Sequence, residues 1–148
     1  MKSWKSVALV AVLLVTATTS QAGHYGRRQY YSGWSSGYGY HYRTYYYQPY
    51  VSYPSYNYHY VVYYPSQPYY YYYNPVRRVY WGRVPVDNDG KAAYSLLAEK
   101  DRKGKLSEIK EEAFPKPGAM PGVPDAKDDV KIAVPPRDLP TGEKPPKR

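Results

Sequence analysis

The 148-residue sequence contains no cysteine. Disulfide bonds are the usual staple of small exported domains, which have little apolar core of their own. A disulfide framework is therefore excluded, and any ordered structure must be held by other contacts.

Large aliphatic side chains are also scarce. Beyond residue 22, valine, isoleucine, leucine and phenylalanine make up 17 of 126 residues, about 13%. Packed domains usually exceed roughly 20%. Ordering a chain costs about 1.5 kcal/mol per residue, and so few aliphatic groups cannot offset that cost. Only collective packing of tyrosines would do so. The composition therefore predicts a mostly intrinsically disordered, low-complexity chain.

Acidic residues are missing from residues 23–83, which carry six arginines and a charge of +6. All twelve acids lie in residues 84–148, where thirteen lysines and arginines nearly balance them. This change predicts a segment boundary near Arg83.

The first 22 residues have the pattern of a secretory signal peptide. Lys2 and Lys5 precede the nine-residue apolar run 7–15, and small residues at −3 and −1 predict cleavage between Ala22 and Gly23. The run is shorter than the roughly 20 residues of a membrane span. We therefore expect an exported protein of the periplasm, cell envelope or medium, with no stable membrane span once the signal is removed.

Tyrosine is the residue that the chain has in abundance. Twenty-two of its 23 tyrosines lie between Tyr25 and Tyr80. Tyrosines alternate with other residues at 38–42 and again at 56–60, which is the period of a β-strand. Proline interrupts the block every few residues, removing backbone donors. We therefore expect short extended pieces and a low-complexity Tyr/Arg segment over 23–83.

Residues 84–114 form a small segment for which we expect weak order. The run 79–86 favours a strand, and the turn sequence 87–90 followed by 92–97 completes a possible β-hairpin over about 79–97. A helix over 92–103 is the alternative, because that stretch is rich in helix-forming residues. Residues 107–114 predict a short helix that begins at Ser107 and is stopped by Pro115. Nine prolines in residues 115–148 predict an extended, charged and solvated tail with polyproline II character.

The sequence does not match the known patterns for metal-binding, phosphate-binding or catalytic sites. Aligning 87–90 with a calcium loop puts Pro85 and Leu96 at the first and last ligand positions, where neither can bind calcium. His24, His41 and His59 are far apart in sequence, without neighbouring cysteines or acids. No nucleophile–base set, phosphate loop or carboxylate pair is recognisable. We therefore expect no metal site, no cofactor and no enzymatic activity.

Tyrosine and arginine together indicate contact chemistry. Tyrosine offers an apolar ring and a hydroxyl, and arginine stacks on such rings. Many such contacts on one chain favour a structural or matrix protein that self-associates. The alternative is a binding segment for an external polysaccharide or other polyanion; export argues against nucleic acid as the physiological partner. Phenols can also couple oxidatively to dityrosine, which would replace the missing disulfides. The candidate contact residues are Tyr45, Tyr46, Tyr47, Tyr69, Tyr70, Tyr71, Tyr72, Tyr73, Arg77 and Arg78.

Three short motifs carry a resemblance to a known group. They are Tyr-Trp-Gly-Arg at 80–83, Tyr-Ser-Leu-Leu-Ala-Glu at 94–99, and Ala-Phe-Pro-x-Pro-Gly at 113–118 followed by Met-Pro at 120–121. This C-terminal half resembles uncharacterised exported Tyr/Pro-rich proteins of planctomycete bacteria. The resemblance implies a bacterial exported protein and nothing further about activity.

Overall fold

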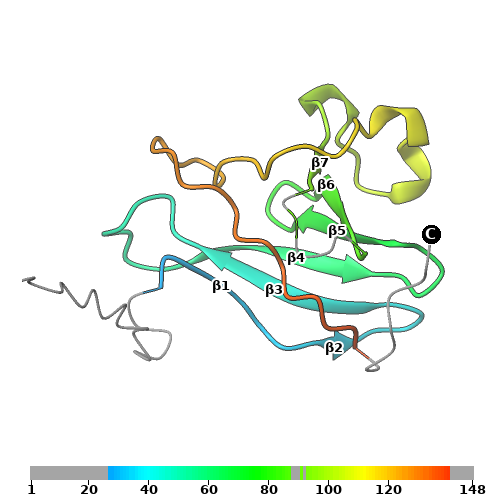
Figure 1. Ribbon diagram of the computed structural model, residues 1–148, viewed down its shortest axis with the longest axis horizontal. Helices are drawn as coiled ribbons and strands as arrows, with labels where there is room; N and C mark the ends of the chain where they lie inside the picture. Colours follow the sequence, from blue (N-terminus) through cyan, green and yellow to red (C-terminus); the bar gives the residue numbers. More distant parts are fainter. Residues whose placement is uncertain (1–26, 88–90, 92, 141–148) are drawn as a thin grey trace, which may run out of the picture.

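The tyrosine block forms the centre of an antiparallel β-sheet (Figure 1). The computed structural model describes residues 27–87, 91 and 93–140. Its strands are β1 (Gln29–Tyr31), β2 (Ser35–Ser36), β3 (His41–Tyr47), β4 (Asn57–Tyr63), β5 (Tyr69–Asn74), β6 (Val79–Pro85) and β7 (Ser95–Leu96). Three 3-10 turns follow, at Glu99–Asp101, Leu106–Glu108 and Glu111–Ala113. The predicted signal peptide, with its cleavage site at Ala22 and Gly23, lies outside the described residues.

The strands pair largely in the order in which they occur along the chain. The sheet order is β1-β3-β4-β5-β6-β7, and β2 pairs with the start of β3 beside β1. The β3–β4 register places Tyr42 opposite Val62 and Tyr46 opposite Tyr58. A register shift between Tyr72 and Tyr73 marks a bulge in the β5–β6 pairing. Short hairpin connections therefore build most of the sheet.

The expectation of a mostly disordered, low-complexity chain is wrong: the described residues form a seven-stranded antiparallel sheet with little helix. The prolines taken as interruptions lie between the strands. Pro49 and Pro54 fall in the β3–β4 connection, Pro65 and Pro68 in the β4–β5 connection, and Pro75 in the β5–β6 turn. Proline suits turns because its φ angle is fixed there without loss of a ladder bond. It therefore separates strands without breaking them.

The aliphatic count failed as a guide to the core because the core is built of tyrosine. Six tyrosines with at most 5% exposure pack with valines of β4 and β6 in the main cluster: Tyr45, Tyr47, Tyr63, Tyr70, Tyr72 and Tyr94. An aromatic side chain buries about 150–250 Å², more than an aliphatic one, and ring pairs add about 0.5–1.5 kcal/mol each. Collective packing of tyrosine rings thus supplies the buried apolar surface that the few valines and leucines cannot.

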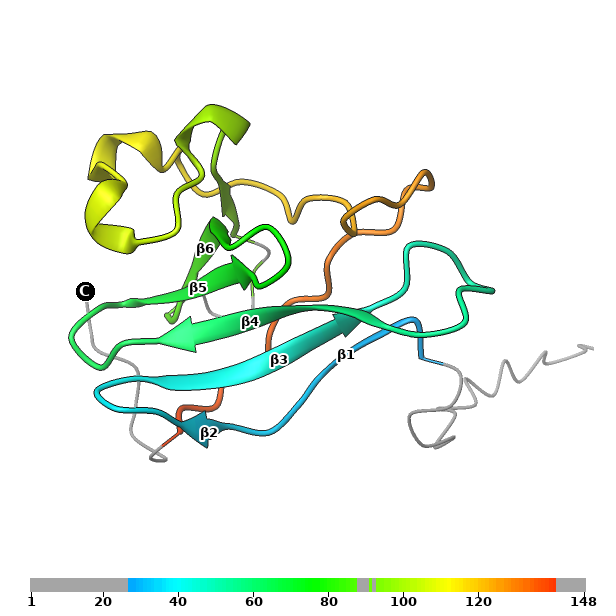
Figure 2. The ribbon, with the colours of Figure 1, turned by 180° about the vertical axis from the view of Figure 1, so that it is seen from behind.

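Residues 115–140 run as an extended strap across one face of the sheet (Figures 1 and 2). Met120, Val123, Ile132 and Leu139 of the strap are buried in the main cluster. The backbone of the strap also bonds to the sheet edge, where the Tyr31 hydroxyl donates to the Ala133 carbonyl at 2.7 Å. The extended geometry expected for a proline-rich tail is present, but the chain in this geometry packs on the sheet.

Residues 97–114 form a second covering segment, which we call the cap. Leu97 and Ile109 of the cap pack on Tyr71 and Tyr80, on the sheet face opposite the strap. The helix expected over 107–114 is not present, and the cap has two separate 3-10 turns there. Ile109 and Phe114, which follow the turns, have extended backbone, and a residue before proline, as Phe114 is, disfavours helical geometry. The strand pairing of the expected hairpin is present, with Gly82 opposite Leu96 and Arg83 opposite Ser95. Residues 88–90 of its turn lie outside the described range.

His59 is the most unusual polar group of the core. It is 0% exposed, its ring contacts Tyr47 and Trp81 edge-on, and neither ring nitrogen has a hydrogen-bond partner among the described residues. Burial, helped by the positive charge of Arg102, lowers its pKa from 6.5 to about 4. The fold therefore holds this imidazole neutral.

Replacing Gly82 by alanine is expected to destabilise the fold. A Cβ at Gly82 would lie 2.3 Å from the Tyr94 ring, which is buried in the main cluster, and 2.5 Å from the Ser95 carbonyl oxygen, which the β6–β7 pairing holds in place. Overpacking of this kind costs about 1–3 kcal/mol. Urea unfolding should show this loss for Gly82→Ala and almost none for Gly33→Ala, where a Cβ meets no atom within 4 Å. Equal stability of the two variants would contradict the packing described for β6 and β7.

His59 should make stability depend on pH. The unfolded imidazole takes up a proton near pH 6.5 while the folded one resists until about pH 4, so stability falls as pH drops across that window and is fully present above it. The expected loss is roughly 3 kcal/mol. Thermal unfolding of His59→Phe should lose this component, whereas His41→Gln, at a half-exposed position, should keep it. An unchanged pH profile in His59→Phe would show that other groups cause the acid sensitivity.

Candidate binding surface on the tyrosine face

The sheet face opposite the strap carries a continuous layer of tyrosine rings. Strand alternation directs Tyr42 and Tyr46 of β3, Tyr58 and Tyr60 of β4, and Tyr73 of β5 to this side. We call the layer the tyrosine face, and its rings are Tyr30, Tyr40, Tyr42, Tyr46, Tyr56, Tyr58, Tyr60, Tyr64, Tyr73 and Tyr80. The cap covers the β5–β6 side of this sheet face, and the β3–β4 side remains accessible.

Neighbouring rings of the face touch one another. Centroids of Tyr58 and Tyr60 lie 5.6 Å apart, those of Tyr42 and Tyr60 lie 5.8 Å apart, and those of Tyr40 and Tyr42 lie 6.2 Å apart. Most of these pairs are tilted or edge-on, the arrangement that ring quadrupoles favour. Tyr58 and Tyr40 are 39% and 37% exposed. The layer is therefore held by its own contacts and still reaches solvent.

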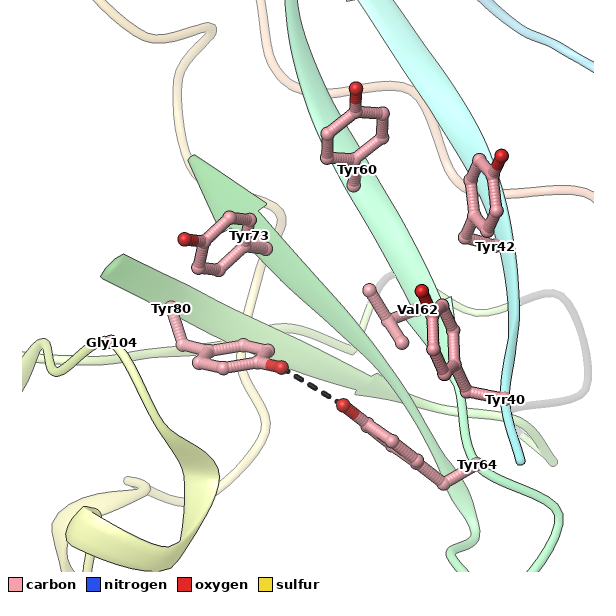
Figure 3. Close-up of a pocket in the computed structure, with 8 residues that line it drawn as sticks. All are labelled: Tyr40, Tyr42, Tyr60, Val62, Tyr64, Tyr73, Tyr80 and Gly104. Carbon is pink, nitrogen blue, oxygen red and sulfur yellow. Dashed lines mark hydrogen bonds between the residues drawn. The ribbon is translucent and has the colours of Figure 1, made fainter. Parts of the chain in front are cut away.

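A groove of about 490 Å³ opens in the tyrosine face (Figure 3). Six tyrosines from the face line it together with Val62 and Gly104. At one side the hydroxyls of Tyr64 and Tyr80 form a hydrogen bond of 3.0 Å, and the Tyr80 backbone N–H donates to the Lys103 carbonyl of the cap. None of the eight lining residues carries a charged side chain. The groove thus offers ring surfaces and hydroxyls.

Two hydroxyls of the groove, those of Tyr60 and Tyr80, stay protonated near neutral pH. Burial, followed by the hydrogen bond to Tyr64, raises the pKa of Tyr80 well above its usual value. Burial also raises the pKa of Tyr60, with neighbouring tyrosines adding to the effect. A neutral phenol both donates and accepts hydrogen bonds but is a weak base. The groove is therefore suited to neutral hydrogen-bonding ligands more than to proton transfer.

The candidate contact residues from the sequence divide among four environments. Four of them are buried beneath the strap: Tyr45, Tyr47, Tyr70 and Tyr72. Tyr69 and Tyr71 lie under the cap, and Tyr46 and Tyr73 belong to the tyrosine face. Arg77 and Arg78 are exposed in the β5–β6 turn, where Arg78 has a φ of 56°.

The sequence prediction missed five of the tyrosines that line the groove: Tyr40, Tyr42, Tyr60, Tyr64 and Tyr80. A signal for three of them was present. Of the alternating tyrosines, Tyr42 lies on β3 and Tyr58 and Tyr60 on β4, all on the same sheet face, and Tyr40 directly precedes β3. The consecutive runs at 45–47 and 69–73 send rings to both faces. Alternation was thus a better guide to the exposed rings than local tyrosine density.

Three of the six arginines of residues 23–83 have acidic partners within the protein. Arg28 pairs with Asp128, Arg83 pairs with Glu111, and Arg43 donates to Asp138 at 2.9 Å. The Arg83 guanidinium also lies 3.7 Å from the centre of the Tyr69 ring and 3.9 Å from that of Phe114. These arginines hold the strap and the cap on the sheet.

The described residues contain no cluster of three or more histidines, cysteines or acids able to hold a metal ion. His41 instead shares a hydrogen bond of 2.9 Å with the Ser36 hydroxyl, and His24 lies outside the described range. Within the same residues, no helical segment has the length and apolar character needed to cross a membrane.

No protein-family model, curated protein or solved structure matches this chain.

Proposed function

We propose that the protein is an exported, non-enzymatic protein whose tyrosine face binds a polysaccharide outside the cytoplasm. The observation that carries this proposal is the groove of about 490 Å³, lined by six tyrosines and by no charged side chain. Its position on a sheet gives it a rigid base, because β3, β4 and β5 are paired along their lengths.

Sugar rings match this surface chemically. The C–H groups of a pyranose carry small positive charges and stack against the negative face of an aromatic ring, while sugar hydroxyls bond to phenols. Along Tyr58, Tyr60, Tyr42 and Tyr40 the centroids are 5.6, 5.8 and 6.2 Å apart, on the order of one sugar ring. A chain of sugars can therefore meet several tyrosines in succession.

The groove favours a neutral polysaccharide over an acidic one. No lining residue supplies a positive charge for a carboxylate or sulfate, and Arg28, Arg43 and Arg83 are engaged with acids of the protein. Arg77 and Arg78 remain exposed in the β5–β6 turn and are not among the eight residues that line the groove. The lining also holds no carboxylate pair for cleaving a glycosidic bond, which supports binding without catalysis.

The structural or matrix role expected from composition is the second candidate. The tyrosine face supports it as well, because half-exposed rings on two copies can stack on each other. The sheet edges support it less. β1 has three residues and β7 has two, so these edge strands offer few backbone groups for pairing with a strand of another copy. Self-association would thus use the same face as the polysaccharide.

Binding should depend on the groove tyrosines. We expect the purified protein to bind an insoluble neutral polysaccharide such as cellulose or starch, with affinity unaffected by salt because no charge lines the groove. Tyr60→Ala should weaken binding about tenfold or more, equivalent to about 1.4 kcal/mol, since aromatic anchors dominate such surfaces. Depletion assays against a panel of polymers measure this directly.

Tyr50→Ala is the matched control, because Tyr50 is 52% exposed in the β3–β4 loop and does not line the groove. It should bind as the unmodified protein does, with both variants keeping the native near-ultraviolet circular dichroism. Binding only to acidic polymers, weakening with salt, would replace the neutral ligand by a polyanion. Concentration-dependent assembly without any polymer, lost in Tyr60→Ala, would favour the matrix role instead.

A further inference from the structure

Three tyrosines cluster where the edge strand β1 meets β3. Tyr30 and Tyr46 are register partners, and their rings stack with centroids 4.7 Å apart and planes 21° from parallel. Tyr56, from the β3–β4 connection, meets the Tyr30 ring edge-on at 5.2 Å. All three rings are half-buried, so part of each ring is accessible to small oxidants.

The same place is where the strap depends on β1. Gln29 donates to the Lys131 carbonyl at 2.8 Å and accepts from the Ala133 N–H at 2.9 Å, and Arg28 pairs with Asp128. β1 itself has only three residues and pairs on one side with β3. Loss of β1 would therefore release part of the strap, and no cysteine is available to fix it.

We propose that Tyr30 and Tyr46 are the site of an oxidative cross-link that joins β1 to β3 as dityrosine. The co-reactant is a peroxide used by a one-electron peroxidase. Each phenol gives up one electron and one proton, and the peroxide is reduced to two molecules of water. The two phenoxyl radicals combine at ring carbons ortho to oxygen, forming one carbon–carbon bond. The hydrogens on those carbons then move to the oxygens, which restores both aromatic rings.

The geometry favours this pair over other tyrosine pairs. Tyr45 and Tyr47 also stack, at 5.3 Å and 22°, but both lie in the core beneath the strap. Tyr50 and Tyr53 are accessible but perpendicular, at 89°. Stacking places the ring carbons of Tyr30 and Tyr46 face to face, and half-exposure leaves part of each ring accessible to the oxidant. Reaction within one sheet also has a far higher effective concentration than reaction between molecules.

The test is limited oxidation of dilute full-length protein with hydrogen peroxide and a haem peroxidase, followed by peptide mapping of the monomer. We expect a linked peptide that contains residues 30 and 46 and lacks two hydrogens, together with dityrosine fluorescence. The treated monomer should unfold at a higher temperature than untreated protein, because the link fixes the edge strand. The proposal does not depend on polysaccharide binding.

Tyr46→Phe and Tyr30→Phe should each lose the linked peptide, since phenylalanine keeps the ring but has no phenol to oxidise. Tyr58→Phe is the matched control: Tyr58 lies on the same face, 6.2 Å from Tyr46, and its loss should leave the Tyr30–Tyr46 peptide in place. A link that maps to Tyr46–Tyr58 or Tyr30–Tyr56, links only between molecules, or no dityrosine in the monomer would each overturn the proposal.

Discussion

The structure depends on burying tyrosine rings while giving most of their hydroxyls a partner. A buried hydroxyl without a hydrogen bond costs about 1–3 kcal/mol, enough to cancel much of the benefit of burying its ring. Tyr31 and Tyr72 share a hydrogen bond of 2.6 Å, and Tyr31 and Tyr70 donate to carbonyls of Ala133 and Asp138 in the strap. Burial raises the pKa of Tyr70 to about 12, so this hydroxyl remains a donor. The strap is thus part of the core, because its backbone carbonyls accept hydrogen bonds from tyrosine hydroxyls of the sheet.

Ion pairs join the strap and the cap to the sheet. The N-terminal half has arginine without acid, and the C-terminal half holds all the acids. In the folded protein Arg28, Arg43 and Arg83 pair across that division. The Arg43 and Arg83 side chains are only 3% and 7% exposed, and the acids that reach them sit on the covering segments. The pairing with Arg83 lowers the pKa of Glu111, so the contact is strongest when this acid is ionised. The separation of arginines and acids along the sequence therefore serves largely to hold the strap and the cap on the sheet.

Local features of the sheet were readable from the sequence, and long-range ones were not. The alternating tyrosines at 56–60 marked β4, those at 38–42 reached only the first two residues of β3, and the paired runs 79–86 and 92–97 marked β6 and β7. The run 69–73 shows no alternation of apolar and polar residues, because the strap and the cap cover opposite faces of β5 and tyrosine rings are buried on both faces. The strap was invisible to such reasoning: its buried residues, Met120, Val123, Ile132 and Leu139, are too widely spaced to give a strand or helix pattern. The exposed groove was missed for the related reason that tyrosine density alone does not say which rings a later segment will cover.

Scarcity of aliphatic side chains then explains why a tyrosine face is left open. The strap and the cap carry most of the aliphatic groups beyond β6, and each covers one region of sheet with them. Neither buried cluster includes Tyr42, Tyr46, Tyr58 or Tyr60. These rings contact one another and the neighbouring rings of Tyr30, Tyr40 and Tyr56. A leucine-rich sheet left open in this way would be an aggregation hazard, whereas phenols keep their hydroxyls in water. The same residue can therefore serve as core where a cover exists and as a stable exposed surface where the cover ends, and that boundary sets the position of the candidate binding site.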